Sequence, residues 1–190
     1  MYLLPLVLSG VLAAAAEPHP FALVEVNEWF EATGKKRSET AFLIAVNTDG
    51  SRATVDLEPS AGKVRQILDP VRKTNTVVNP AARTAASTSF GSRRETGDRC
   101  HERYNGHRGA LVLVDHYAGA IHGVPVIRIT VDDPSGLWME VHLAPSLGCQ
   151  MLQSSMRQRG VLIQSMTTRD LRVGPPDPAL FAVPADYRRY

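Results

Sequence analysis

Hydrophobic and polar residues alternate along most of the chain after residue 20, which is the period of a β-strand with one buried face. In "LVEVNEWFE" the apolar Val24 and Val26 fall on one face, and Glu25, Asn27 and Trp29 fall on the other. A helix across the same residues is the alternative. The strand is preferred because β-branched and aromatic residues crowd this stretch.

Turn sequences separate the alternating stretches. "NTDG" ends with Asp49-Gly50, a pair that tolerates the positive φ of tight hairpins, and Asp69-Pro70 and Asp133-Pro134 are further turn signals. Arg159-Gly160 separates the last two stretches. The pattern predicts about nine short strands in hairpin succession. We therefore expect a mainly β fold: a strongly curved antiparallel meander sheet, or half-barrel.

Two segments lack this alternation. Residues 79–109 are small, polar and basic, which predicts a long loop with at most a short helix. The chain ends in "GPPDPALFAVPADYRRY", where "PDPALF" is compatible with one helical turn. We expect this C-terminal segment to act as a structural plug, with Leu180 and Phe181 carried to the edge or open end of the sheet and Phe181 buried.

Length and composition fit one globular domain over residues 17–190. Of the 190 residues, 44% are hydrophobic and 21% are charged, so disorder of the whole chain is excluded. The net charge of +2 is too small to imply a polyanion partner. Residues 61–109 are basic, with 10 Lys or Arg against 4 Asp or Glu, and form either a solvated loop or a rim for anionic headgroups. They contain no interleaved aromatic platform, which argues against nucleic acid.

Residues 1–16 resemble a secretory signal peptide. They carry no charged side chain and end in small residues, with a possible cleavage site after Ala16. The apolar run is too short for a membrane span, and it departs from the signal pattern in having no Lys or Arg near its start. A buried strand is the alternative. The prediction is export to the periplasm or the extracellular space, with no stable membrane span after cleavage.

The cysteine content is consistent with export. Cys100 and Cys149 are the two cysteines, and an exported chain is expected to oxidise them to a disulfide. Two free thiols in a cytosolic protein are the competing interpretation.

Several segments together resemble a known group. The order "NTDGSRATVDL", "ILDPVRKTNTVV", "GVPVIRI", "EVHLAPSLGC" and "PDPALFAVPADY" resembles that of uncharacterised secreted bacterial β-rich domains, over residues 20–187. The architecture is more loosely similar to the periplasmic lipoprotein carriers. That likeness implies a half-barrel sheet that binds acyl chains under a helical lid. The chain departs from the carriers because residues 79–109 lack an amphipathic helix. The likeness to the carriers identifies no binding residue in this chain.

The sequence offers little catalytic chemistry. "HERYNGH" separates His101 and His107 by six residues instead of the four that a zinc protease helix needs. A looser metal site that adds Cys100 is incompatible with a disulfide. Glu25 and Glu140 are placed on outward faces, where they do not converge. We therefore expect no catalytic residue, no metal and no cofactor.

The leading hypothesis is a non-enzymatic, exported binding protein. It would hold an apolar or amphiphilic ligand, such as a lipid or acyl chain, in the concavity of the curled sheet. The alternative is a protein–protein interaction module of the cell envelope without a small ligand. A hydrolase is the third possibility.

Overall fold

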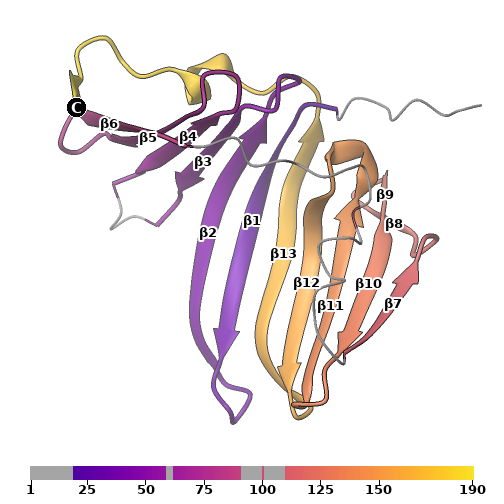
Figure 1. The fold of residues 1–190 in the computed structure, drawn as a ribbon. Helices are drawn as coiled ribbons and strands as arrows, with labels where there is room; N and C mark the ends of the chain where they lie inside the picture. Colours follow the sequence, from indigo (N-terminus) through magenta and orange to yellow (C-terminus); the bar gives the residue numbers. More distant parts are fainter. Residues whose placement is uncertain (1–18, 59–61, 91–99, 101–109) are drawn as a thin grey trace, which may run out of the picture.

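The computed structural model describes residues 19–58, 62–90, 100 and 110–190 and shows a curved, open β-sheet (Figure 1). The strands in this part of the chain are β1 (Phe21–Phe30), β2 (Lys36–Val46), β3 (Arg52–Asp56), β4 (Arg65–Asp69), β5 (Thr74–Asn79), β6 (Thr84–Ser89), β7 (Leu111–Asp115), β8 (Ala120–Ile121), β9 (Val124–Pro125), β10 (Ile127–Asp132), β11 (Leu137–Ala144), β12 (Gln150–Gln158), β13 (Val161–Val173) and β14 (Arg188–Arg189). Two short 3₁₀ helices are η3 (Pro145–Leu147) and η4 (Pro178–Phe181).

Twelve strands form one sheet in the order β14-β6-β5-β4-β3-β2-β1-β13-β12-β11-β10-β7, and β8 and β9 form a separate hairpin. All neighbouring strands of the large sheet are antiparallel except β14, which runs parallel to β6. The sheet is mainly an antiparallel meander, strongly curved and not closed into a barrel. The expected fold class is confirmed.

The predicted turns form through side-chain bonds to their own backbone. Asp49 Oδ1 accepts from the Ser51 amide at 2.8 Å, and Gly50 takes a φ of 78°. Asp69 Oδ1 accepts from the Arg72 amide at 2.8 Å. Each carboxylate satisfies a backbone donor that the tight turn leaves unpaired, which is why Asp recurs at these positions.

The loop expected over residues 79–109 is partly a strand. Asn79 ends β5 and Thr84–Ser89 forms β6, with the register Val78↔Ala85 and Asn79↔Thr84. The error has a physical cause. The small side chains of β6 carry no hydrophobic alternation, whereas the backbone ladder that holds the strand needs none. Residues 91–99 and 101–109 lie outside the described part of the chain.

The direction of the curl follows from one hydrogen bond. In an antiparallel ladder, directly paired residues lie on the same face, so Arg52, Val46 and Phe21 share one face, called here the inner face. Arg52 on β3 donates to Gln150 Oε1 on β12 at 3.2 Å. Four strand-to-strand steps separate these strands, which is about 19 Å in a flat sheet. One side chain cannot span that distance, so the sheet curls toward the inner face.

The inner face carries most of the hydrophobic core. One cluster joins Phe21, Leu23 and Ile44 to residues of the β8–β9 connection and η3, including Val124 and Leu147. A second cluster contains Ile127, Ile129, Val131, Val141, Leu143 and Cys100.

The disulfide expected between Cys100 and Cys149 is present, with a Cα–Cα distance of 5.4 Å. It closes a loop of 49 residues and stabilises the fold by about 4 kcal/mol in the chain-entropy model. The bond ties residue 100 to the segment between η3 and β12, against the second inner-face cluster.

The buried face changes at β2. Ile44 is 2% exposed and its neighbour Ala45 is 0% exposed, although consecutive strand residues point to opposite faces. Ala45 pairs with Ala53, which pairs with Ile67. The strands β3 to β6 therefore bury apolar residues on the outer face, whereas the rest of the sheet buries most of them on the inner face, with Val26 of β1 as an exception.

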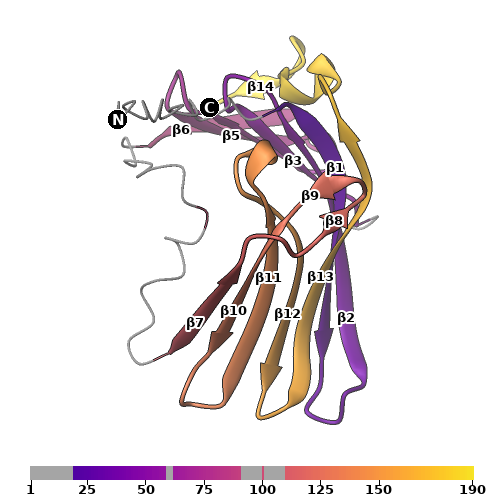
Figure 2. The same ribbon diagram turned by 90° about the vertical axis from the view of Figure 1, so that its right-hand side faces the viewer.

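The C-terminal segment covers this outer face. Val183 and Tyr187 pack on the cluster of Ile67, Val78 and Ala85. Figures 1 and 2 show the segment running along one side of β3–β6 and ending in β14. It lies against a sheet face instead of filling the open end of the half-barrel. Phe181 was expected to be buried but is half-buried, as is Leu180, because η4 lies at the margin of the covered area.

Polar contacts hold the C-terminal segment in place. The Arg65 guanidinium donates to the carbonyls of Ala179 and Ala182, at 2.8 and 2.5 Å, and so spans η4. Arg83 forms an ion pair with Asp186. Burial lowers the pKa of Arg65, while the nearby Tyr187 acts in the opposite direction. The prolines limit the conformations available before docking, which reduces the entropy lost when the segment packs.

We predict that Tyr187→Ala destabilises the protein by about 1–3 kcal/mol, because its ring packs on the outer-face cluster. Tyr190→Ala is the matched control, since Tyr190 is 68% exposed and its loss should change stability little. Urea unfolding of both variants measures the difference. Equal stabilities would show that the C-terminal segment does not depend on this packing.

Candidate functional site

The ladder registers place three rows of side chains across the inner face, from β10 to β2. The first row is Val131, Met139, Met156, Gln164, Trp29 and Ser38. The second row is Ile129, Val141, Ser154, Met166, Asn27 and Thr40. The third row consists of Ile127, Leu143 and Met151 on β10 to β12 and of Thr168, Glu25 and Phe42 on β13 to β2. In these rows the residues on β10 and β11 are all apolar, whereas the polar residues occur on β12, β13, β1 and β2, beside the apolar Met166, Trp29 and Phe42.

The apolar half of the inner face contains adaptable side chains. Met139 and Met156 are direct ladder partners and are half-buried, beside the fully buried Ile129 and Val141. Methionine has an unbranched, polarisable side chain that adjusts to apolar surfaces of different shape. This half of the face therefore offers a flexible apolar contact surface at the middle of the curl.

The polar half contains a compact cluster of four residues. Glu25 pairs with Thr168, and Asn27 pairs with Thr40, so all four share the inner face. Asn27 Nδ2 donates to Glu25 Oε1 at 2.8 Å. The Oγ1 atoms of Thr40 and Thr168 are buried and have no hydrogen-bond partner within the described residues. We call Glu25, Asn27, Thr40 and Thr168 the polar cluster.

A half-buried cation, Arg52, lies close to the polar cluster. Burial lowers the pKa of Arg52 from its ordinary value, and the negative charge of Glu25 acts in the opposite direction. Arg52 also makes the bond to Gln150 that closes the curl. The inner face thus combines an apolar half with a polar half that contains one charge of each sign.

Sequence reasoning missed the polar cluster. It assigned Glu25 and Glu140 together to outward faces, whereas the register places Glu25 on the inner face and Glu140 on the outer face. The alternation in β1 was read correctly, but alternation does not tell which face is enclosed. Trp29 and Trp138 are likewise on opposite faces, so they are not cross-strand partners.

The outer face of the central strands has the character of a solvated surface. Lys36 contacts Glu28 at 3.2 Å and Glu39 at 2.6 Å, and Ser165 donates to Glu28 at 3.0 Å. Hydrogen bonds to Glu39 and then to Glu28 raise the pKa of Lys36. These groups pair with one another at the surface, so they do not make a site of their own.

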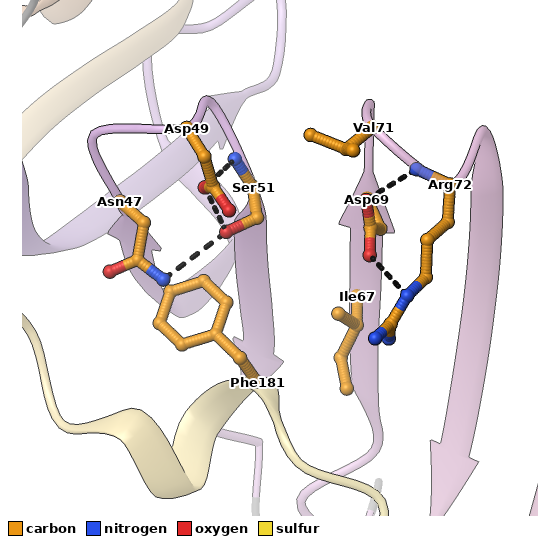
Figure 3. A pocket seen from close by; sticks show the side chains of 8 residues that line it. All are labelled: Asn47, Asp49, Ser51, Ile67, Asp69, Val71, Arg72 and Phe181. Atoms are coloured by element: carbon orange, nitrogen blue, oxygen red, sulfur yellow. Dashed lines mark hydrogen bonds and ion pairs between the residues drawn. The ribbon is translucent and has the colours of Figure 1, made fainter.

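A second candidate is a cleft on the outer face beside the C-terminal segment, with adjoining volumes of about 320 and 330 Å³ (Figure 3). Ile67 and Phe181 line it together with the turns of β2–β3 and β4–β5. Its polar groups bond to one another: Ser51 bonds to Asp49, and Arg72 contacts Asp69 at 3.7 Å. The polar groups of the cleft are therefore engaged within the two turns, and Ile67 and Phe181 form its apolar wall.

Metal and catalytic chemistry find little support in the described residues. No group of three or more His, Cys, Asp or Glu side chains lies close enough there to hold a metal ion. Cys100 is bonded to Cys149 and cannot act as a ligand, while His101 and His107 lie outside the described part. His122 contacts the Thr168 carbonyl at 2.8 Å, and His142 is on the outer face of β11, so these two histidines do not converge.

One edge of the sheet is apolar. On β7, Leu111 is 58% exposed and Leu113 is 56% exposed, and β10 is the only strand paired with β7 among the described residues. Apolar edge strands are favourable places for another chain to pair. In the same described part of the chain, no helix is long and apolar enough to span a membrane.

Comparison with known proteins identifies similar folds but no family. No family model and no curated protein sequence matches the chain. An uncharacterised conserved protein from Thermus thermophilus has a TM-score of 0.55 and 8% identity, over 90% of each chain. MucB has a TM-score of 0.55 and 16% identity over 92% of this chain, which spans 60% of MucB.

A LolA superfamily protein from Nitrosomonas europaea has a TM-score of 0.42 and 10% identity, over 88% of this chain and 91% of its own. The expected similarity to an uncharacterised protein of like fold is found among solved structures. At these identities the likeness concerns the fold alone.

The bonds of the β2–β3 turn predict a pH effect. Hydrogen bonds from the Ser51 side chain and amide hold the pKa of Asp49 below its ordinary value of 3.8. A lowered folded-state pKa stabilises the fold above the unfolded value, and this contribution is lost as pH falls through the folded pKa. Ser51→Ala should raise the Asp49 pKa and reduce the stability lost to acid at this site. An NMR titration of the Asp49 carboxyl carbon tests this, and an unchanged pKa would contradict it.

Proposed function

We propose that the protein is an exported binding protein that holds an amphiphilic molecule, such as a lipid or acyl chain, against its inner face. The observation that carries the proposal is the composition of that face. Half-buried Met139 and Met156 form an apolar surface on the concave side of the sheet, next to Gln164, and Asn27 lies in the adjacent row. A molecule with an apolar chain and a polar end is complementary to such a divided surface.

The curl supports binding instead of catalysis. A concave sheet surrounds an elongated ligand on several sides and removes more of its apolar area from water than a flat sheet could. The polar groups on the inner face come from neighbouring strands and lack an arrangement of nucleophile, base and orienting group among the described residues. Export is part of the proposal. It is supported by the disulfide and by the signal-like residues 1–16.

A specific observation favours a second function. The exposed Leu111 and Leu113 on the edge strand β7 form an apolar strip suited to pairing with a strand of another envelope protein. This alternative needs no ligand on the inner face, so the two functions respond to different substitutions.

We predict that Met156→Lys weakens binding of a decyl-chain amphiphile by about tenfold or more, because it places a charge in the apolar half of the inner face. Ser155→Lys is the matched control, since the adjacent residue points to the outer face. Isothermal titration calorimetry with monodecanoylglycerol measures both variants against the wild-type protein.

Native mass spectrometry of the exported chain supplies an independent observation, because a co-purifying amphiphile adds mass that is lost on denaturation. If the wild-type protein binds no monodecanoylglycerol, or if both lysine variants bind equally well, the inner face is not the binding surface. Binding of an envelope protein that is lost in Leu113→Lys would then favour the β7 edge.

A further inference from the structure

We infer that the polar cluster recognises the polar end of the ligand, and that this end carries hydrogen-bond donors, as a hydroxyl, amine or amide does, instead of being an anion. This inference rests on the proposed function and adds the chemical class of the ligand. It follows from the unsatisfied polar groups of the inner face.

The first observation is the state of the two threonine hydroxyls. Thr168 is 7% exposed, and its Oγ1 has no partner within the described residues; the same holds for the buried Oγ1 of Thr40. Burying a hydroxyl without a hydrogen bond is unfavourable, and valine has nearly the same shape without that cost. Two such hydroxyls on one face, next to a carboxylate, are therefore understandable if a bound molecule supplies their partners.

The second observation is the sign of the charge among the four residues. Glu25 Oε1 accepts from Asn27 at 2.8 Å, and a carboxylate has the capacity to accept further hydrogen bonds. A carboxylate only accepts hydrogen bonds, so a ligand group beside it must donate. A phosphate or carboxylate at this position would be repelled by Glu25, while a hydroxyl, amine or amide would be attracted.

The third observation is the position of the polar cluster relative to the apolar half. Asn27 and Thr40 lie in the same row as Ser154 and Val141. A chain lying over Met139 and Met156 can thus place its polar end on β1 and β2 without leaving the inner face. Met139 and Met156 belong to the adjacent row, so the chain crosses from one row to the next before it reaches the polar cluster.

Arg52 does not reverse this preference. Its guanidinium already donates to Gln150 Oε1 at 3.2 Å, and the residue is half-buried at the start of β3. Burial lowers the pKa of Arg52, and the negative charge of Glu25 acts in the opposite direction.

The test compares three probes that share a decyl chain and differ at the polar end: monodecanoylglycerol, decylamine and decanoate. We expect the first two to bind the wild-type protein about tenfold more tightly than decanoate, measured by calorimetry below their micellar concentrations. Glu25→Gln should remove most of the advantage of decylamine.

Thr168→Val should weaken binding of monodecanoylglycerol by up to about tenfold while leaving the melting temperature unchanged or higher, because it removes a buried hydroxyl that lacks a partner. A purely structural residue would not show lost affinity with retained stability. Thr167→Val is the matched control, since Thr167 is the next residue of β13 and pairs on the outer face.

Equal binding of all three probes, or equal effects of Thr168→Val and Thr167→Val, would overturn the assignment of the head group. The proposed function would then stand, with the chain alone recognised. If none of the probes binds the wild-type protein, both the proposed function and this inference fail.

Discussion

The structure depends on how an open twelve-stranded sheet covers its apolar side chains. The burial of both Ile44 and Ala45, consecutive residues of β2, shows that the covered face changes within the sheet. From β1 to β10 the inner face must be covered, and from β3 to β6 the outer face must be. A closed barrel avoids this problem, because its interior is one continuous face. In this chain, separate segments cover the apolar side chains of the two faces.

Two irregular parts of the sequence follow from that constraint. Cys100 is bonded to Cys149 and packs in the inner-face cluster, and the proline-rich C-terminal segment packs on the outer-face cluster through Val183 and Tyr187. Arg65 holds η4 by two main-chain carbonyls, which is possible because the guanidinium presents its donors in a fixed planar fork. The inner face between these covered regions is where the apolar and polar halves meet.

The sequence predicts the class of fold well and the site poorly. The Asp-Gly and Asp-Pro turns, the strand at Phe21–Phe30 and the disulfide are local or compositional signals, and the structure confirms them. Alternation in β1 separates Glu25 from Val26 but does not decide which face is enclosed, since that depends on the curl. The strand β6 was missed because its small residues show no alternation.

The same limit explains why the polar cluster needs the structure. Glu25, Thr40 and Thr168 are brought onto one face by β1, β2 and β13, and Thr168 is far from Glu25 in the sequence. Their common feature, buried hydroxyls beside a carboxylate, exists only after the strands pair. The apolar half is similarly assembled from separate hairpins, with Met139 placed against Met156.

The claim that an amphiphile occupies the inner face is tested most directly by NMR of methionine and isoleucine methyl groups during addition of monodecanoylglycerol. Met139 and Met156 lie on the inner face, and Ile67 lines the cleft on the outer face. The predicted result is a saturable shift of the two methionine signals while the Ile67 signal stays in place. A shift of Ile67 with unchanged methionine signals would contradict the claim and would place binding beside the C-terminal segment.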